Sequence, residues 1–147
     1  MSEALRLTHE GQGRWERNDR EGYEALWADD ATWTNMDGED TYRGPKEICD
    51  FLWAFRDAWS EDVRLEIQQE FGDDTQCVTV GRFTGSHSGP LPTPNGPLPP
   101  TGKQVNLPLC QVVTVQDGKV KSVLNCNAVM YTLIQLGLAP MPEGAPA

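Results

Sequence analysis

Two apolar runs joined by a turn signal, within residues 103–138, constrain this chain more than any other stretch. The runs are rich in Val and Leu and flank Gln-Asp-Gly-Lys at 116–119. Asp-Gly between such runs predicts a tight β-hairpin, because Gly accepts the positive φ that the turn needs. Residues 128–136 lack Gly and Pro, and Gly137 suits the end of a helix. We therefore expect a long hairpin and then a short helix, in a sheet that the rest of the chain covers on one face.

The composition argues against two classes of partner. The formal net charge is −10 over 147 residues, whereas nucleic acids and anionic membranes are bound through Lys and Arg. Neither is expected as a partner. This length suits one domain with one core. We expect a single domain at residues 1–139 and a flexible C-terminal tail at residues 140–147.

The four cysteines favour a reducing compartment. None belongs to a CxxC pair and no His lies at ligand spacing beside one, so no metal site or redox motif is expected. Each lies in or beside an apolar run, where a free Cys behaves as a small buried hydrophobe. The N-terminus lacks an apolar segment of signal-peptide type, and no run approaches the length of a membrane span. The chain is therefore predicted to be cytoplasmic.

The first sixty residues predict helices around one short strand. A helix is expected over 2–17, and a second one starts at Asn18 and ends near 28–30. A strand at 31–35 and a polar loop at 36–41 follow. Pro45 opens a third helix. Its apolar stripe at helical spacing consists of Ile48, Phe51, Leu52, Phe55 and Trp59.

The second half of the chain predicts the sheet. Residues 63–71 alternate as a half-buried strand, and residues 76–87 form the next one. Residues 88–102, rich in Pro and Gly, are a surface loop or a lid over a pocket. Strands in succession are expected to pair antiparallel. The predicted fold is α+β: a curved antiparallel sheet wrapped around the N-terminal helices as a cone, or α+β barrel, whose interior is a hydrophobic ligand cavity.

Six motifs in this order resemble the SnoaL-like polyketide cyclase family, within the NTF2-like superfamily. They are EGYEALWADDATWTN, YRGPKEICDFLWAF, GRFTGSHSGPL, PPTGKQVNL, DGKV and LIQLGL, which together extend from about residue 22 to residue 138. The resemblance implies the same α+β cone, a homodimer, a hydrophobic cavity and no bound cofactor. It also implies a polyketide-type aromatic small molecule as the ligand.

The resemblance also implies where the catalytic groups of a cyclase would lie. Cyclases of this family close a ring by intramolecular aldol addition, with a carboxylate as acid/base and a Gln-x-His pair on the preceding strand. Gln111 matches the Gln, whereas the His position falls on Val113. The Asp position falls on Asn127, or on Ala128 if the register shifts by one residue. No acidic residue lies between Asp117 and the end of the last helix.

This departure favours a different reaction. An amide cannot take a proton from carbon, although it can hydrogen-bond an enolate oxygen. The resemblance then points to the hydroxylase-like branch of anthracycline biosynthesis, in which a cofactor-free tailoring enzyme orients an electron-rich aromatic ligand toward oxygen. The alternatives are a polyketide cyclase with a relocated base such as His87, and a non-catalytic small-molecule-binding protein.

The candidate catalytic residues are Asn127, Gln111 and His87, and the candidate substrate-binding residues are Trp33, Asn35, Phe51, Phe55, Val113 and Asn125. Each also has a structural interpretation: His87 as a hydrogen-bonded residue at the rim, Trp33 as core, and Asn125 with Asn127 as a face toward solvent or a partner subunit. Gln111 could make a structural hydrogen bond. Because buried amides must be hydrogen-bonded, two amides on one face of the last strand are unusual for a dry core.

An acidic loop is the remaining polar feature. Asp37, Glu39 and Asp40 could bind a cation, but the spacing of a calcium loop with its later Glu is absent. The loop is therefore interpreted as solvated, and no metal site is expected.

Overall fold

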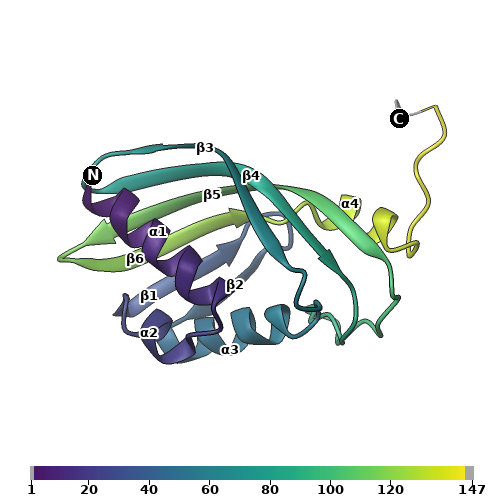
Figure 1. Cartoon of the computed structure of the whole chain (residues 1–147), viewed down its shortest axis with the longest axis horizontal. Coiled ribbons are helices and arrows are strands. Elements are labelled where there is room, and N and C mark those ends of the chain that lie inside the picture. The colour runs from purple at the N-terminus through teal and green to yellow at the C-terminus, as the bar shows by residue number, and fades with distance from the viewer. Residues whose placement is uncertain (1, 145–147) are drawn as a thin grey trace.

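In the computed structural model, which describes residues 2–144, a curved six-stranded sheet wraps around helices from the N-terminal part of the chain (Figure 1). The two edge strands do not pair, so the predicted α+β cone is confirmed as an open sheet and not as a closed barrel. The elements are α1 (Glu3–Glu16), α2 (Arg20–Glu24), β1 (Trp27–Asn35), β2 (Asp40–Arg43), α3 (Pro45–Arg56), β3 (Arg64–Gly72), β4 (Gln76–Ser86), β5 (Gln104–Gln116), β6 (Lys119–Cys126) and α4 (Val129–Gln135).

The strand order is β2-β1-β6-β5-β4-β3. Antiparallel pairing of consecutive strands is confirmed from β3 to β6. β1 also pairs antiparallel with its successor β2. It lies parallel to β6, however, so the prediction of a wholly antiparallel sheet is wrong at this contact. Parallel neighbours need a crossover connection, and here β2, α3 and the strands β3–β5 intervene between them. The first and last strands of the chain thus meet inside the sheet.

The predicted hairpin and final helix are confirmed. β5 and β6 pair antiparallel down to Gln116 and Lys119. Asp117 and Gly118 connect them with φ of 52° and 75°, the left-handed conformations that a two-residue hairpin turn requires. α4 follows β6, and Gly137 ends it with φ of 75°.

The predicted boundaries within residues 18–43 need correction. The second helix ends at Glu24, and Trp27 already belongs to β1, where it pairs with Val120. Strand pairing and packing of the Trp27 ring against Tyr23 override the local helical pattern. The predicted polar loop contains the short strand β2, which pairs with the end of β1.

The first long strand, β3, is an exposed edge strand and not half-buried as predicted. Ile67 and Phe71 are 36% and 58% exposed. A bulge between Ile67 and Gln69 breaks the alternation, because one extra residue shifts every later side chain to the other face. Beyond the bulge, the Glu70 side chain is turned inward and is 7% exposed.

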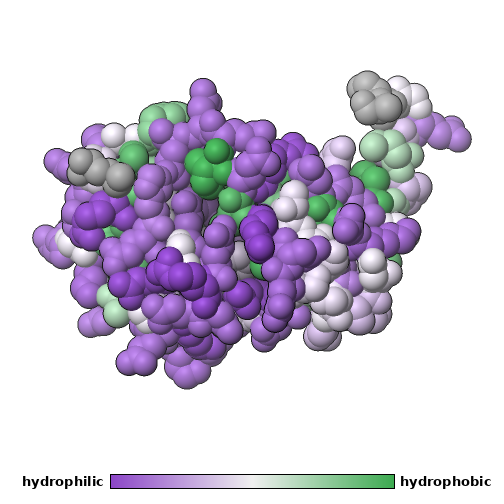
Figure 2. All heavy atoms as spheres, viewed as in Figure 1, coloured by the Kyte–Doolittle hydropathy of each residue, from purple (hydrophilic) through white to green (hydrophobic). Residues whose placement is uncertain are grey.

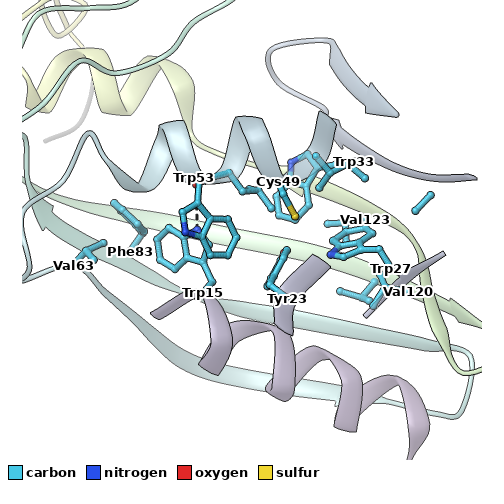
Figure 3. Close-up of a cluster of buried hydrophobic side chains, with 14 of the residues drawn as sticks. Trp15, Tyr23, Trp27, Trp33, Cys49, Trp53, Val63, Phe83, Val120 and Val123 are labelled. Atoms are coloured by element: carbon cyan, nitrogen blue, oxygen red, sulfur yellow. Dashed lines mark hydrogen bonds between the residues drawn. The ribbon is translucent and has the colours of Figure 1, made fainter. Parts of the chain in front are cut away.

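Aromatic side chains make up much of the core between the helices and the sheet (Figure 3). Trp15 of α1 and Trp53 of α3 lie there with Tyr23 of α2. The Trp15 Nε1–H donates to the Leu52 carbonyl at 3.2 Å, and the Trp53 Nε1–H donates to Asn18 Oδ1 at 2.7 Å. Each ring therefore buries its apolar area without leaving its N–H unpaired.

Hydrophilic side chains cover most of the face in Figure 2, in keeping with the net charge of −10. Among residues 2–144, no helix has both the length and the apolar character that crossing a membrane requires. The division into a domain at 1–139 and a tail at 140–147 stays a prediction, and residues 145–147 lie outside the described part of the chain.

A pair of matched substitutions tests the placement of core and edge. Ile48 on α3 is fully buried, so Ile48→Ala is expected to lower the free energy of unfolding by about 2–5 kcal/mol. Ile67→Ala removes the same atoms from the β3 edge and is expected to cost less than about 1 kcal/mol. Urea unfolding of both variants measures this difference, and equal losses would contradict the edge assignment.

Candidate functional site

A cavity of about 230 Å³ lies between the helices and the concave face of the sheet. Its lining is mainly apolar and aromatic, from α1, α3, β5, β6 and α4. The Pro- and Gly-rich segment contributes Leu91, Pro92, Thr93, Pro94 and Leu98 to the lining. Of its two interpretations, a rim over a pocket is therefore confirmed.

His87 holds the end of the Pro- and Gly-rich segment through hydrogen bonds to Thr101. Its Nδ1 accepts a hydrogen bond from the Thr101 backbone N–H at 3.2 Å and lies 3.0 Å from Thr101 Oγ1. The ring is fully buried beside Trp59, with centroids 5.5 Å apart, and it does not contribute to the cavity lining. The prediction of a proton shuttle at the mouth is thus corrected, because His87 continues the alternation of buried side chains along β4 and is enclosed in the wall.

One transverse row of the sheet is polar from edge to edge. Cross-strand partners place their side chains on the same face, and here they follow one another through all six strands. The row consists of Asp40, Asn35, Asn125, Gln111, Thr79 and Glu70. Its members from β2, β1, β6 and β5 contribute to the cavity lining. At the other end, Thr79 Oγ1 donates to Glu70 Oε2 at 2.7 Å outside the lining.

A cluster of amides converges on the Asn35 side chain. Trp33 Nε1–H and Asn127 Nδ2–H donate to Asn35 Oδ1 at 2.8 and 3.0 Å. Asn125 Nδ2–H donates to the same oxygen at 3.3 Å and also to Asn127. Asn35 Nδ2–H in turn donates to Asp40 Oδ2 at 2.8 Å. We call Trp33, Asn35, Asp40, Asn125 and Asn127 the Asn35 cluster.

The Asn35 cluster keeps hydrogen-bonding capacity for a ligand. Asn125 Oδ1 is buried and has no partner among the described residues. Buried acceptors without a partner are rare in folded proteins, and this one belongs to a residue of the cavity wall. Gln111 lies directly opposite Asn125 on β5 and also lines the cavity. A ligand hydroxyl that donates to Asn125 would remove the deficit.

From the sequence, Asp40 is recognised only as part of the acidic loop, and its place in the cavity is missed. It lies at the start of β2, opposite Asn35, and lines the cavity. Burial and the nearby Asp40 carboxylate together raise the pKa of Tyr42 well above its usual value. The register that pairs Asp40 with Asn35 would have placed Asp40 in the cavity, but this register can be predicted only if residues 40–43 are recognised as a strand.

The rest of the acidic loop is structural or exposed. Asp37 accepts hydrogen bonds from the backbone N–H groups of Asn127 and Val129, at 3.1 and 2.9 Å, where α4 begins. Carboxylates are favourable at helix N-termini. Glu39 is exposed at a φ of 56°. The interpretation as a solvated loop therefore fits the exposed Asp37 and Glu39 and is wrong for Asp40, which lines the cavity.

The remaining predicted residues lie around the same cavity. Phe51 and Phe55 of α3 are partly buried in its lining, and Phe51 stacks on Tyr42 with ring centroids 4.2 Å apart. Val113 of β5 is buried and also belongs to the lining. The structure thus brings together every predicted site residue except His87.

Comparisons with known proteins agree with this architecture. The sequence matches the family model of the SnoaL-like domain over residues 12–123. None of the curated proteins matches the chain.

Three solved structures illustrate the fold. AclR from Streptomyces galilaeus, described as a candidate hydroxylase, has a TM-score of 0.75 and 22% identity over 94% of this chain and 98% of that chain. A candidate SnoaL-like polyketide cyclase from Jannaschia sp. CCS1 has a TM-score of 0.77 and 18% identity over 94% and 91%. A hypothetical protein from Catenulispora acidiphila with a ketosteroid isomerase-like fold, in complex with trimethylamine, has a TM-score of 0.70 and 18% identity over 90% and 93%. At these identities the likenesses show the fold alone.

The buried His87 predicts a pH dependence of stability. Burial lowers the pKa of its imidazole, so the unfolded chain binds more protons between the folded pKa and the ordinary value of about 6.5. The contribution of neutral His87 is fully present above about pH 6.5 and is lost as the pH falls toward the folded pKa. Urea unfolding between about pH 7 and about pH 5 should show a steeper loss of stability for the wild type than for His87→Gln.

His9→Gln is the matched control, because the chain has two histidines and the His9 side chain is 45% exposed. This variant should keep the steep loss. Identical pH profiles of the wild type and His87→Gln would contradict a buried, neutral His87.

Proposed function

The chain belongs to the SnoaL-like domain family, and we propose that it is an enzyme that removes a proton from a carbon acid in a polyketide-type aromatic ligand, in the manner of a polyketide cyclase. One observation carries the proposal. The Asp40 carboxylate and the amides of the Asn35 cluster lie together in a mainly apolar, aromatic cavity. A base beside hydrogen-bonding amides is the pair of groups that enolate formation requires.

The proposed reaction begins at Asp40. Its carboxylate takes the proton from a carbon next to a carbonyl group of the ligand, and the negative charge moves to that carbonyl oxygen. Amide N–H groups of Asn127 or Gln111, both in the lining, stabilise this enolate oxygen. The enolate carbon then attacks a second carbonyl of the same molecule, forming the C–C bond. Asp40 returns its proton to the alkoxide that results.

Asp40 can supply the carboxylate that the end of β6 and α4 lack. No acidic residue follows Asp117 within β6 and α4, and that absence favoured a hydroxylase. Asp40 lies on the edge strand β2 and accepts a hydrogen bond from the Asn35 amide at the end of β1. The amides at Asn125 and Asn127 therefore do not leave the cavity without a proton acceptor, and cyclase-type chemistry becomes the better-supported candidate.

A hydroxylase is the second candidate, favoured by the likeness to AclR. The same carbanion would then react with dioxygen instead of a carbonyl. The hydroperoxide formed needs a two-electron reductant to give the alcohol and water, and a hydroquinone-type ligand could supply both electrons. Proton removal by Asp40 is common to the two candidates, whereas only the hydroxylase consumes oxygen.

The cavity also indicates the size and charge of the ligand. An apolar cavity of about 150 Å³ accommodates benzene, so 230 Å³ accommodates a larger flat aromatic system. Among the described residues, Asp40 is the only charged side chain of the lining. A neutral ligand with ring hydroxyls therefore suits it, and a carboxylate near Asp40 does not.

Asp40→Asn tests the proton transfer. Loss of the base should lower the rate by about 10²–10⁴-fold while ligand affinity stays similar, because the amide preserves the shape of the side chain. The measurement is exchange of deuterium from heavy water into the acidic carbon of an anthraquinone-type β-keto ester, followed by NMR. This readout does not depend on which product finally forms.

Glu39→Gln is the control, since it removes one exposed carboxylate from the same loop. It should exchange deuterium at the wild-type rate. If Asp40→Asn exchanges deuterium at the wild-type rate, the assignment of Asp40 as the base is wrong. If the wild type binds the ligand without exchanging deuterium, the non-catalytic binding protein is favoured. Ring closure under argon supports the cyclase, whereas a product that needs oxygen supports the hydroxylase.

A charge comparison tests the proposed ligand class. The methyl ester of an aromatic ligand should bind at least about tenfold more tightly than the corresponding free acid at pH 7, because the Asp40 carboxylate repels a second one in a poorly solvated cavity. Isothermal titration calorimetry measures both affinities. Asp40→Asn should reduce the ratio of the ester affinity to the acid affinity. Equal affinities of the wild type for ester and acid would contradict a neutral ligand. The homodimer and the cytoplasmic location stay predictions.

A further inference from the structure

Two of the four cysteines lie outside the core, in contrast to the prediction that all are buried. Cys49 and Cys77 are fully buried. Cys110 of β5 and Cys126 of β6 are free and exposed. They are also direct partners in the antiparallel register of the two strands, so both thiols project from the same convex face of the sheet.

The strand geometry sets the distance between the two residues. The Asn125 carbonyl accepts a hydrogen bond from the Met36 N–H, on the side of β6 that faces β1. Because backbone groups of successive residues point to opposite edges, those of Cys126 point to β5. Cys110 and Cys126 therefore form a hydrogen-bonded pair, with an expected Cα separation of about 5.5 Å. Disulfides have Cα separations of about 4.4–6.8 Å.

We propose that Cys110 and Cys126 are a modification site, at which hydrogen peroxide oxidises the two thiols to a reversible intramolecular disulfide. One S–S bond forms and two S–H bonds break; the two electrons and two protons pass to the peroxide, which becomes two water molecules. An exposed disulfide of this kind is more easily reduced than a buried structural one. The site is independent of the proposed enzymatic function.

The two cysteines lie next in sequence to residues of the cavity wall. Gln111 follows Cys110 in β5, and Asn125 and Asn127 flank Cys126. These three side chains line the cavity on the opposite face of the sheet. A covalent link between the two strands therefore forms directly behind the amides of the Asn35 cluster.

Thiol counting and peptide mapping test the proposal. The folded, reduced protein should present two thiols to a disulfide reagent, because Cys49 and Cys77 are shielded. Burial, Asp37 and the neighbouring Cys110 raise the pKa of Cys126, so oxidation with hydrogen peroxide is carried out at mildly alkaline pH. The accessible count should fall to zero, and mass spectrometry of the alkylated digest should show a peptide pair linking Cys110 to Cys126. Dithiothreitol should restore both thiols.

Cys110→Ser and Cys126→Ser are the test variants, and each should form no intramolecular disulfide. Both positions are exposed, and circular dichroism checks that the variants fold. Cys77→Ala is the control that should keep the link. Persistence of two free thiols under conditions that fully oxidise a reference dithiol would overturn the proposal. So would cross-links only between molecules, seen as dimers on a non-reducing gel.

Discussion

The parallel contact between β1 and β6 is the constraint on which the candidate site depends. It joins two strands whose paired residues Asn35 and Asn125 lie 90 positions apart in the chain. β2 adds Asp40 on one side of this contact, and β5 adds Gln111 on the other. A shift of one residue in this pairing would turn the side chains of one strand to the convex face. The register therefore determines which polar groups meet in the cavity.

This arrangement is difficult to explain by stability alone. Burying an amide in apolar surroundings is unfavourable unless its hydrogen bonds are made. Asn35 Oδ1 meets this need by accepting from three donors, but Asn125 Oδ1 remains unpaired. Valine at such positions, as at Val113 and Val123 in the neighbouring paired row, would pack without that penalty. A ligand that donates a hydrogen bond to Asn125 Oδ1 would offset the cost of burying the amides.

The parts of the fold that the sequence predicts correctly are those with strong local signals. Asp117-Gly118 marks the hairpin, and the apolar stripe of α3 marks the helix that covers the sheet. The errors arise where distant pairing outweighs local pattern. Trp27 leaves a helical run because β6 pairs with it, and a bulge turns Glu70 inward. Within the site, the alternation along β6 predicts which face of the sheet Asn125 occupies. The position of Asp40, in contrast, follows only from the register of a four-residue strand.

The position of a catalytic carboxylate in the chain matters less than its position in the cavity. In the proposed reaction one negative charge moves from Asp40 to the ligand oxygen, so the cavity never has to accommodate a second charge. Amides suit this transfer, because the N–H groups of Asn35 and Asn127 are fixed dipoles close to the beginning and end of the path. An additional carboxylate at Asn127 would repel both Asp40 and the enolate. A neutral amide at Asn127 is therefore what an acid placed on β2 requires.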